Sequence, residues 1–321
     1  MKYTLKSSLA TLASLLVWAI IIFSPINELQ ARDLYLQTFG NADHVPVLFL
    51  HGGPGYNCAS FEVTTAQRLA DQGFFVIAYD RRGEGRSRDK NARYTFKESN
   101  KDIKSIMKTY GLKSVHLIGH SFGGITAVKF AEKNKKAVKS ITLVGAPVSL
   151  QASFKSIIKT CEKIYIEKKD ETNLDYIRQL YKMDSNSLQY SSYCFMHAMQ
   201  CGFYSCKNPN PLALSLYKLF STDTVLINNA SKMGYKEPKA FWENEAYTTL
   251  DLKEALIGLK NNGLPIFGLY GKEDGLYAPA QISELSEIIG ESNLLYLDDC
   301  SHSVFIDQQA VFIASLSKWL K

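Results

Sequence analysis

The pentapeptide G-H-S-F-G at residues 119–123 restricts the fold of this 321-residue chain more than any other segment. It follows an apolar run at residues 115–118 and precedes a stretch of helical composition at residues 125–132. A sharp turn between a strand and a helix strains the backbone of the central serine, and a glycine on either side leaves room for that turn. The segment therefore predicts a strand, a tight turn and a helix, with Ser121 standing clear at the end of the strand.

Partners for this serine follow later in the chain. A serine hydroxyl becomes a strong nucleophile when a histidine accepts its proton and a carboxylate orients the histidine. The apolar run 265–270 predicts a buried strand, and the turn after it contains Glu273 and Asp274. The strand predicted at 293–297 is followed by a turn that reaches His302. We expect Ser121 as nucleophile, His302 as base and Asp274 as the orienting acid, with Glu273 as the alternative acid.

A glycine-rich turn predicts the remaining part of such a site. The sequence H-G-G-P-G at residues 51–55 follows an apolar strand predicted at residues 45–50. Acyl transfer builds negative charge on the substrate oxygen, and backbone N–H groups fixed in advance stabilise that charge. We expect the amides of Gly53 and Phe122 to form this oxyanion hole. The alternative is a simple Gly-Pro turn.

The order of elements predicts the architecture. Strands alternate with helical patterns through residues 33–148 and again from about residue 262, which is typical of a mainly parallel sheet with helices on both faces. The candidate residues all follow strands, so they meet at one edge of the sheet. We predict an α/β core of residues 32–148 and 251–321. Residues 149–250 predict a helical cap over the site, or alternatively a surface decoration.

Taken together, these motifs resemble the α/β-hydrolase superfamily over residues 33–321. H-G-G-P-G at 51–55 and D-R-R-G-E-G-R-S at 80–87 are similar to signatures of its proline iminopeptidase branch. The turn around Ser121 at residues 119–123, called the nucleophile elbow, differs from that branch. The branch usually carries G-G-S-W-G there, whereas the G-H-S-x-G form found here is widespread among esterases and lactonases. The resemblance implies an α/β-hydrolase fold and a serine hydrolase that forms an acyl-enzyme without a metal or organic cofactor.

The resemblance also implies a substrate class. An aminopeptidase acting on short peptides is the leading expectation, and a carboxylic-ester or lactone hydrolase is the alternative. A non-catalytic ligand-binding member of the fold is a more distant one. Related aminopeptidases bind the free amine of the substrate with carboxylates of the cap, which implies Glu243 or Glu245; a solvated helix end is the other interpretation of these two residues. The segment at 80–87 is expected to be structural, with Asp80 and an arginine tying the loop, although substrate contact by Arg81 or Arg82 is the alternative.

The N-terminus differs in character from the rest of the chain. Lys2 and Lys6 precede an uncharged apolar run at residues 9–23, and residues 1–31 therefore predict a secretory signal peptide. An uncleaved membrane anchor formed by residues 9–23 and a buried helix are the alternatives. We accordingly expect an exported protein, periplasmic or secreted, with possible membrane association through this segment.

Charge and cysteines set further bounds. The net charge of +6 comes from scattered lysines rather than a basic face with aromatics, so we expect a small-molecule or short-peptide substrate and no nucleic acid. All six cysteines lie after residue 31, and four of them fall in the predicted cap. Disulfides, free thiols and a zinc site that includes Cys201 and Cys206 are all compatible with their spacing. We expect no metal.

Overall fold

The computed structural model describes residues 34–321. The predicted signal peptide or anchor at residues 1–31 lies outside the described residues, and export stays a prediction. Over the described part of the chain, no helix is long and apolar enough to cross a membrane.

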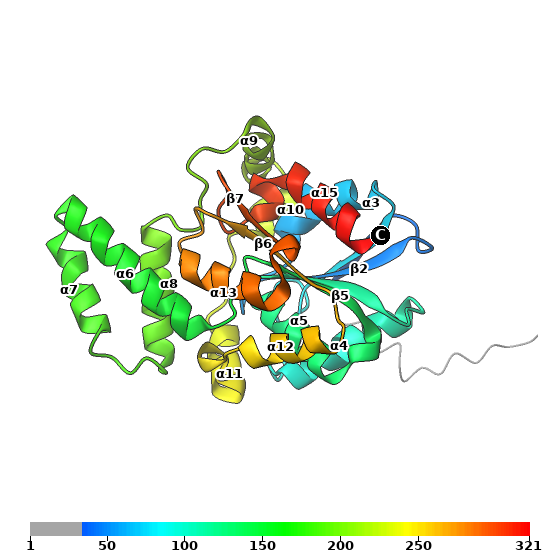
Figure 1. Cartoon of the computed structure of the whole chain (residues 1–321), viewed down its shortest axis with the longest axis horizontal. Coiled ribbons are helices and arrows are strands. Elements are labelled where there is room, and N and C mark those ends of the chain that lie inside the picture. Colours follow the sequence, from blue (N-terminus) through cyan, green and yellow to red (C-terminus); the bar gives the residue numbers. More distant parts are fainter. Residues whose placement is uncertain (1–33) are drawn as a thin grey trace, which may run out of the picture.

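A seven-stranded sheet forms the centre of the molecule (Figure 1). Its order is β1-β3-β2-β4-β5-β6-β7, and among the strands of residues 34–321 only the edge strand β1 runs antiparallel to its neighbour. The strands are β1 (Leu36–Phe39), β2 (Val45–Leu50), β3 (Phe74–Tyr79), β4 (Val115–His120), β5 (Val138–Val144), β6 (Ile266–Gly271) and β7 (Leu294–Leu297). The predicted α/β fold with a mainly parallel sheet is confirmed.

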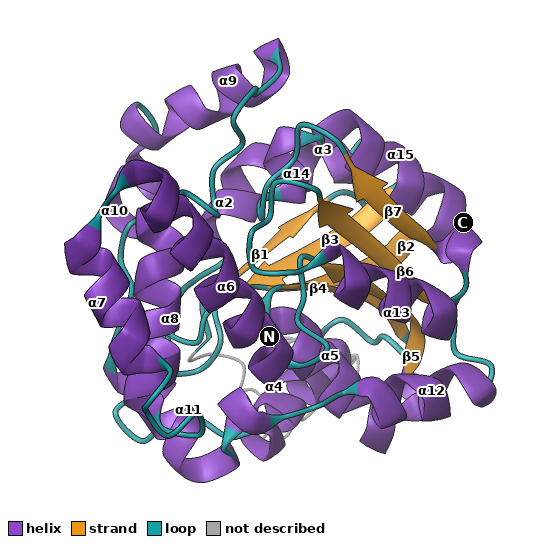
Figure 2. Ribbon diagram, turned by 60° about the vertical axis from the view of Figure 1, so that its left-hand side comes forward, coloured by secondary structure: helices purple, strands orange, loops and turns teal. Residues whose placement is uncertain are grey.

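Helices cover both faces of this sheet, as Figure 2 shows. One face carries α4 (Phe96–Thr109), α5 (Phe122–Lys133), α12 (Lys253–Asn261) and α13 (Pro279–Ile289). The other face carries α2 (Ala59–Phe61), α3 (Gln67–Ala70), α14 (Val304–Asp307) and α15 (Gln309–Leu320), with a π-helical turn between α2 and α3. Each layer of helices closes its own apolar cluster against the sheet.

Strand β2 shows why both faces must be covered. Its side chains alternate, so that Leu48 and Leu50 enter one apolar cluster while Val47 and Phe49 enter the other. All four are essentially inaccessible to solvent. A strand that is apolar on both faces is stable only between two layers of helices, which is the arrangement typical of parallel sheets.

Residues 149–250 form a helical insert between β5 and α12. Its two ends meet at a bridge between Ser149 and Asp251, and the amide of Leu252 donates to the carbonyl of Val148 at 2.8 Å. Most of its helices begin at a capping side chain: Asp170, Ser187, Asn210 and Asp223 each accept a bond from a first-turn amide. The helices are α6 (Leu150–Lys168), α7 (Glu171–Leu180), α8 (Leu188–Gln200), α9 (Pro211–Lys218), α10 (Thr224–Asn229) and α11 (Lys236–Glu245).

Candidate active site

Ser121 occupies the sharp turn between β4 and α5. Its backbone has φ 52° and ψ −124°, in the left-handed half of the Ramachandran plot that serine seldom adopts, and its amide donates to the carbonyl of Val144 at 2.9 Å. A Cβ at Gly123 would overlap the carbonyl of Leu50, and one at Gly119 would lie 2.6 Å from Gly124. The two flanking glycines are therefore required by close backbone approach as well as by the turn.

The predicted acid and base lie together at the same edge of the sheet. Asp274 follows β6 and His302 follows β7, and His302 Nδ1 lies 2.8 Å from Asp274 Oδ2. Both side chains are buried. The alternative acid, Glu273, instead accepts a bond from the amide of Lys207 in the insert. Because the Nδ1 proton of His302 is donated to Asp274, Nε2 is the acceptor nitrogen of this histidine. In this conformation, within residues 34–321, no hydrogen bond joins His302 to Ser121.

A second histidine supports the backbone of His302. His120 Nε2 lies 3.1 Å from the carbonyl oxygen of His302, and the two rings are 4.8 Å apart between centroids. Burial, and then the neighbouring His302, lower the pKa of His120 to about 3. His120 is therefore neutral at ordinary pH and donates to that carbonyl. In the sequence His120 is only the second residue of the pentapeptide at 119–123, and nothing in that pattern predicts this contact.

Arg81 fixes the predicted oxyanion loop, residues 51–55, by hydrogen bonds to two of its carbonyls. Its Nη1 donates to the carbonyl of His51 and its Nη2 to that of Gly52 at 2.6 Å. Gly53 has φ 116° and lines the same pocket as Ser121 and Phe122. Among the described residues, the amides of Gly53 and Phe122 donate no hydrogen bond, so both are free to meet a substrate oxygen.

Arg81 is itself part of a buried ion pair with Glu84. The Arg81 Nη2 to Glu84 Oε2 distance is 2.9 Å, and both side chains are almost inaccessible to solvent. Glu84 Oε2 also accepts the amide of Gly55 at 2.8 Å, while His51 Nε2 accepts the amide of Arg81 at 2.9 Å. Burial and the Arg81 charge hold the pKa of His51 well below its usual range, and burial raises the pKa of Glu84. The loop is thus clamped by an ion pair that does not line the pocket.

The rest of the 80–87 segment is also structural. Asp80 pairs with Arg86, with 2.7 Å between Oδ2 and Nε, and accepts the amide of Cys58. Arg82 pairs instead with Asp102, at 2.7 Å. Neither arginine that was considered for substrate contact, Arg81 or Arg82, lines the pocket at Ser121.

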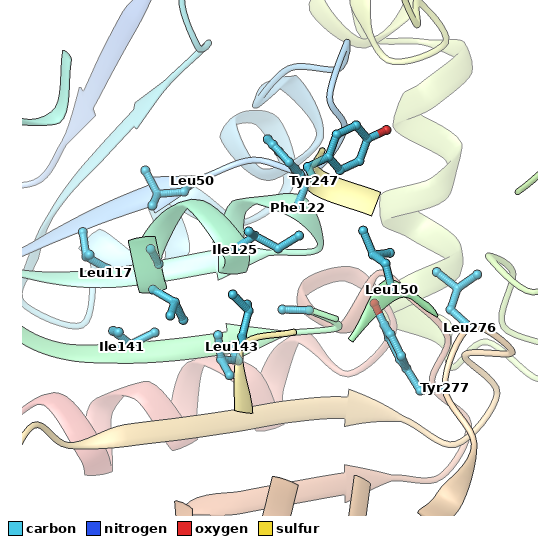
Figure 3. Close-up of a cluster of buried hydrophobic side chains, with 14 of the residues drawn as sticks. Leu50, Leu117, Phe122, Ile125, Ile141, Leu143, Leu150, Tyr247, Leu276 and Tyr277 are labelled. Carbon is cyan, nitrogen blue, oxygen red and sulfur yellow. The ribbon is translucent and has the colours of Figure 1, made fainter. Parts of the chain in front are cut away.

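The pocket beside Ser121 is small and apolar in this conformation. Its volume is about 20 Å³, which is little more than the space one water molecule needs. Among its lining residues, Phe122 and Tyr247 lie close together in Figure 3, and Leu150, Leu276 and Tyr277 form a neighbouring group. Tyr277 is fixed because its hydroxyl donates to the carbonyl of Gly145 at 2.7 Å. No charged side chain of the described residues lines this pocket.

Comparison with known proteins gives the family. The family model described as "alpha/beta hydrolase fold" matches residues 45–309, which is most of the chain. The chain belongs to the alpha/beta hydrolase fold family. The predicted resemblance to this superfamily is confirmed.

Curated relatives of this alpha/beta hydrolase narrow the branch. A proline iminopeptidase of Lactobacillus delbrueckii subsp. lactis is 26% identical over 297 residues, covering 89% of this chain and 94% of the relative. A proline iminopeptidase of Chitinophaga pinensis is 24% identical over 298 residues, covering 90% and 94%. The similarity to the proline iminopeptidase branch expected from the motifs is therefore confirmed over almost the whole length of both chains.

Solved structures agree with the fold. A proline iminopeptidase-related protein from Thermus thermophilus superposes with a TM-score of 0.64 at 19% identity, covering 89% of this chain and 92% of that one. An esterase from Exiguobacterium antarcticum superposes with a TM-score of 0.59 at 20% identity, covering 91% and 97%. At such identities the likeness shows the fold alone.

The two cap carboxylates expected to bind an amine lie elsewhere in this alpha/beta hydrolase. Glu243 is exposed and forms an ion pair with Lys239 at 3.7 Å. Glu245 accepts the amide of Phe96 through Oε1 at 2.8 Å. Neither lines the pocket at Ser121. The structure therefore does not bring these two residues to the candidate site.

A third cap carboxylate, Glu237, does not line the pocket at Ser121 either, but it lies next to the oxyanion loop at residues 51–55. It is in the first turn of α11, and its Oε2 is buried with no hydrogen-bond partner in the described part of the chain. Its carboxylate lies over Gly234, at the place where a Cβ would stand, and the amide of Gly234 donates to the carbonyl of Gly55 at 3.0 Å. Burial raises the pKa of Tyr94 to about 12 and also raises that of Glu84, and the charge of Glu237 adds to both shifts. No local sequence pattern predicts that Glu237 lies beside this loop.

The cysteines carry no part of this site. All six are free thiols, four of them buried. No group of three or more histidine, cysteine or acidic side chains within residues 34–321 is arranged to hold a metal ion, Cys201 and Cys206 included.

Proposed function

We propose that this alpha/beta hydrolase is a serine hydrolase that works through an acyl-enzyme. Ser121 attacks the substrate carbonyl and gives its proton to His302 Nε2, while Asp274 fixes the histidine tautomer and stabilises its positive charge. The amides of Gly53 and Phe122 bind the oxyanion. His302 then protonates the leaving group, and it activates the water that releases the acyl group. The buried 2.8 Å contact between His302 and Asp274, at the sheet edge that carries the strained Ser121, supports these roles.

We further propose that the substrate is a short peptide with a free N-terminal amine, as in a proline iminopeptidase. The observation that carries this proposal is the unpartnered, buried oxygen of Glu237 beside the 51–55 loop. A buried carboxylate oxygen without a donor is costly, and a substrate ammonium group would satisfy it while gaining a strong interaction away from water. The curated relatives, which are proline iminopeptidases, support the same class.

The pocket supports a small apolar acyl group. Its walls are side chains such as Ile125, Leu150 and Leu276, and its volume is small before any movement of the insert. A pyrrolidine ring fits such walls better than a long or charged side chain, because an apolar pocket offers a charged group no partner. We therefore place proline and small apolar residues first among the N-terminal residues released.

The test compares L-prolyl-p-nitroanilide with its N-acetylated form in the wild type and two variants. A hydrogen bond to a charged group contributes about 1.5–3 kcal/mol, so Glu237→Gln is expected to lower kcat/KM for the free amine by about 10- to 100-fold. The N-acetylated substrate is expected to be poor with every variant. Glu243→Gln is the matched control, since this exposed glutamate lies in the same helix and is expected to leave kcat/KM unchanged.

Two outcomes would reject the amine proposal. One is equal turnover of the free and acetylated amides. The other is a larger effect of Glu243→Gln than of Glu237→Gln.

A carboxylic-ester or lactone hydrolase is the second candidate. The observation that favours it is the absence of any charged side chain among the described residues that line the pocket at Ser121. Turnover of p-nitrophenyl acetate and butyrate without turnover of prolyl-p-nitroanilide would establish it. In that case the loop at 51–55 serves only oxyanion binding.

A further inference from the structure

A second, larger cleft lies where the insert meets the core, between α4, α5 and α11. Its volume is about 480 Å³. The insert is tied here to the first residue of α4 and to the segment before it, because Glu245 accepts the amide of Phe96 at 2.8 Å and Asn244 Nδ2 donates to the carbonyl of Arg93 at 2.9 Å. In Figure 2, α11 lies near α4. The polar side chains that line the cleft are Lys97, Asn100, Lys129, Glu132, Lys133 and Glu245.

The wall of this cleft contains an unpaired acceptor, the side-chain oxygen of Asn100. The residue is only 8% exposed, and its Oδ1 is buried with no hydrogen-bond partner among residues 34–321. Leaving a buried amide oxygen unpaired costs about 1–3 kcal/mol. Asn100 also lines the cleft, so a ligand carrying an N–H donor would satisfy this oxygen.

The charges around Asn100 define the chemistry of the ligand. Lys129 is paired with Glu132 at 3.2 Å, whereas Lys97 and Lys133 make no ion pair with a described residue. These two lysines offer a site for a carboxylate. Asn100 Oδ1 and the Glu245 carboxylate offer acceptors for an ammonium group. Cations and acceptors in one cleft match a molecule that carries both charges.

We propose that this cleft binds a zwitterion of the amino-acid or short-peptide class, at a site separate from Ser121. The carboxylate of the ligand contacts Lys97 and Lys133, and its ammonium group contacts Asn100 and Glu245. Binding at this cleft does not depend on the proposed function. The further inference that the ligand is a product of the enzyme rests on the proposed function, because an aminopeptidase releases free amino acids.

The cleft is connected to the candidate active site by aromatic packing. The ring of Phe96 stacks on that of Phe122, with 5.9 Å between centroids and 27° between planes. Phe241 of α11 packs against Phe122 at 5.1 Å. Phe122 carries one of the two predicted oxyanion amides. A ligand that fixes Phe96 and Glu245 therefore acts on the residue next to the nucleophile, and we expect it to change kcat rather than to compete for substrate.

Calorimetric titration of the full chain tests the proposal, with L-proline and L-prolylglycine as probes. The protein is first treated with a fluorophosphonate, so that Ser121 is blocked and only binding elsewhere is measured. We expect both zwitterions to bind, and N-acetyl-L-proline and L-prolinamide to bind at least about tenfold more weakly, because each lacks one charge.

Variants separate this cleft from other sites. Lys133→Gln, at an exposed position, and Asn100→Leu are each expected to weaken binding by about tenfold or more. Lys136→Gln is the matched control, an exposed lysine just past α5 that does not line the cleft. If Asn100→Leu unfolds the protein, Lys133→Gln decides by itself.

Three results would overturn the proposal. They are no binding of either zwitterion, binding unchanged by Lys133→Gln, and binding that is lost when Ser121 is blocked. If the fluorophosphonate does not label the protein, the proposed function fails. The titration of unlabelled protein with the same variants still decides whether the cleft binds the zwitterion.

Discussion

Replacing Arg81 with methionine tests the clamp behind the oxyanion loop. Methionine fills part of the space but cannot donate, so Glu84 loses its buried partner, and the carbonyls of His51 and Gly52 lose their donors. Removing one member of a buried ion pair costs about 3–5 kcal/mol of unfolding free energy. A domain near the middle of the ordinary range of about 5–15 kcal/mol remains folded after this loss, so activity is measurable.

The effect on catalysis follows from the position of Gly53. Loss of one oxyanion donor lowers kcat by about 10²–10³-fold, and a loop released from Arg81 no longer holds the Gly53 amide in place. We expect kcat to fall toward this range while KM changes little. Urea unfolding followed by circular dichroism measures the first effect. Steady-state kinetics, normalised to the fraction of protein labelled by a fluorophosphonate, measure the second.

A double variant separates stability from positioning. Arg81→Met with Glu84→Gln leaves no unpaired charge and keeps an acceptor for the amide of Gly55. We expect it to recover most of the stability and little of kcat, because the two carbonyls still lack donors. The clamp is refuted if Arg81→Met alone lowers neither stability nor kcat, or if the double variant restores kcat.

Two further predictions concern the fold that carries the site. Burial and the charge of Lys139 lower the pKa of His116 to about 4, so the unfolded chain binds this proton more readily. The stabilisation that comes from keeping His116 neutral is present above pH 6.5 and is lost as the pH falls toward 4, by about 2 kcal/mol between pH 7 and pH 5. His116→Asn is expected to remove this part of the pH dependence of the unfolding free energy, measured by urea unfolding. An unchanged pH dependence would contradict this. Gly123→Ala is expected to abolish activity and strongly destabilise the protein, because its Cβ overlaps the Leu50 carbonyl, whereas Gly258→Ala, with open space around it in α12, is expected to raise Tm slightly. Equal thermal melting curves for the two glycine variants would show that the elbow tolerates a side chain.

Local patterns were enough to predict the core of the fold. The strands expected at residues 45–50 and 293–297 are found as β2 and β7, with a one-residue difference at the start of β7. Buried parallel strands are continuous apolar runs, and the residue after each one falls at a shared edge. Because of that geometry, His302 and Asp274 were expected at the same edge of the sheet, and the structure does bring these two residues into contact.

Contacts between segments far apart in the chain could not be predicted from the sequence. Glu237 lies beside the 51–55 loop because the amide of Gly234 donates to the carbonyl of Gly55, a contact that no local pattern encodes. The sequence around Glu243 suggested an amine-binding role, yet Glu243 lies on α11 exposed to solvent and pairs with Lys239. Arg81 was weighed as a substrate ligand, and only the folded chain reveals that its guanidinium donates to the carbonyls of His51 and Gly52 instead. The orientation of a side chain on a loop depends on what packs against it.

Labelling of Ser121 tests the proposed chemistry most directly. The full chain and its Ser121→Ala variant are incubated with a fluorophosphonate and the modified peptide is identified by mass spectrometry, alongside kcat for whichever amide or ester is turned over. We predict labelling at Ser121 alone and a fall in kcat of about 10⁴-fold or more in the variant. An unlabelled wild type with no turnover would indicate a non-catalytic ligand-binding protein. Activity near the wild-type level in Ser121→Ala would contradict the proposed mechanism outright.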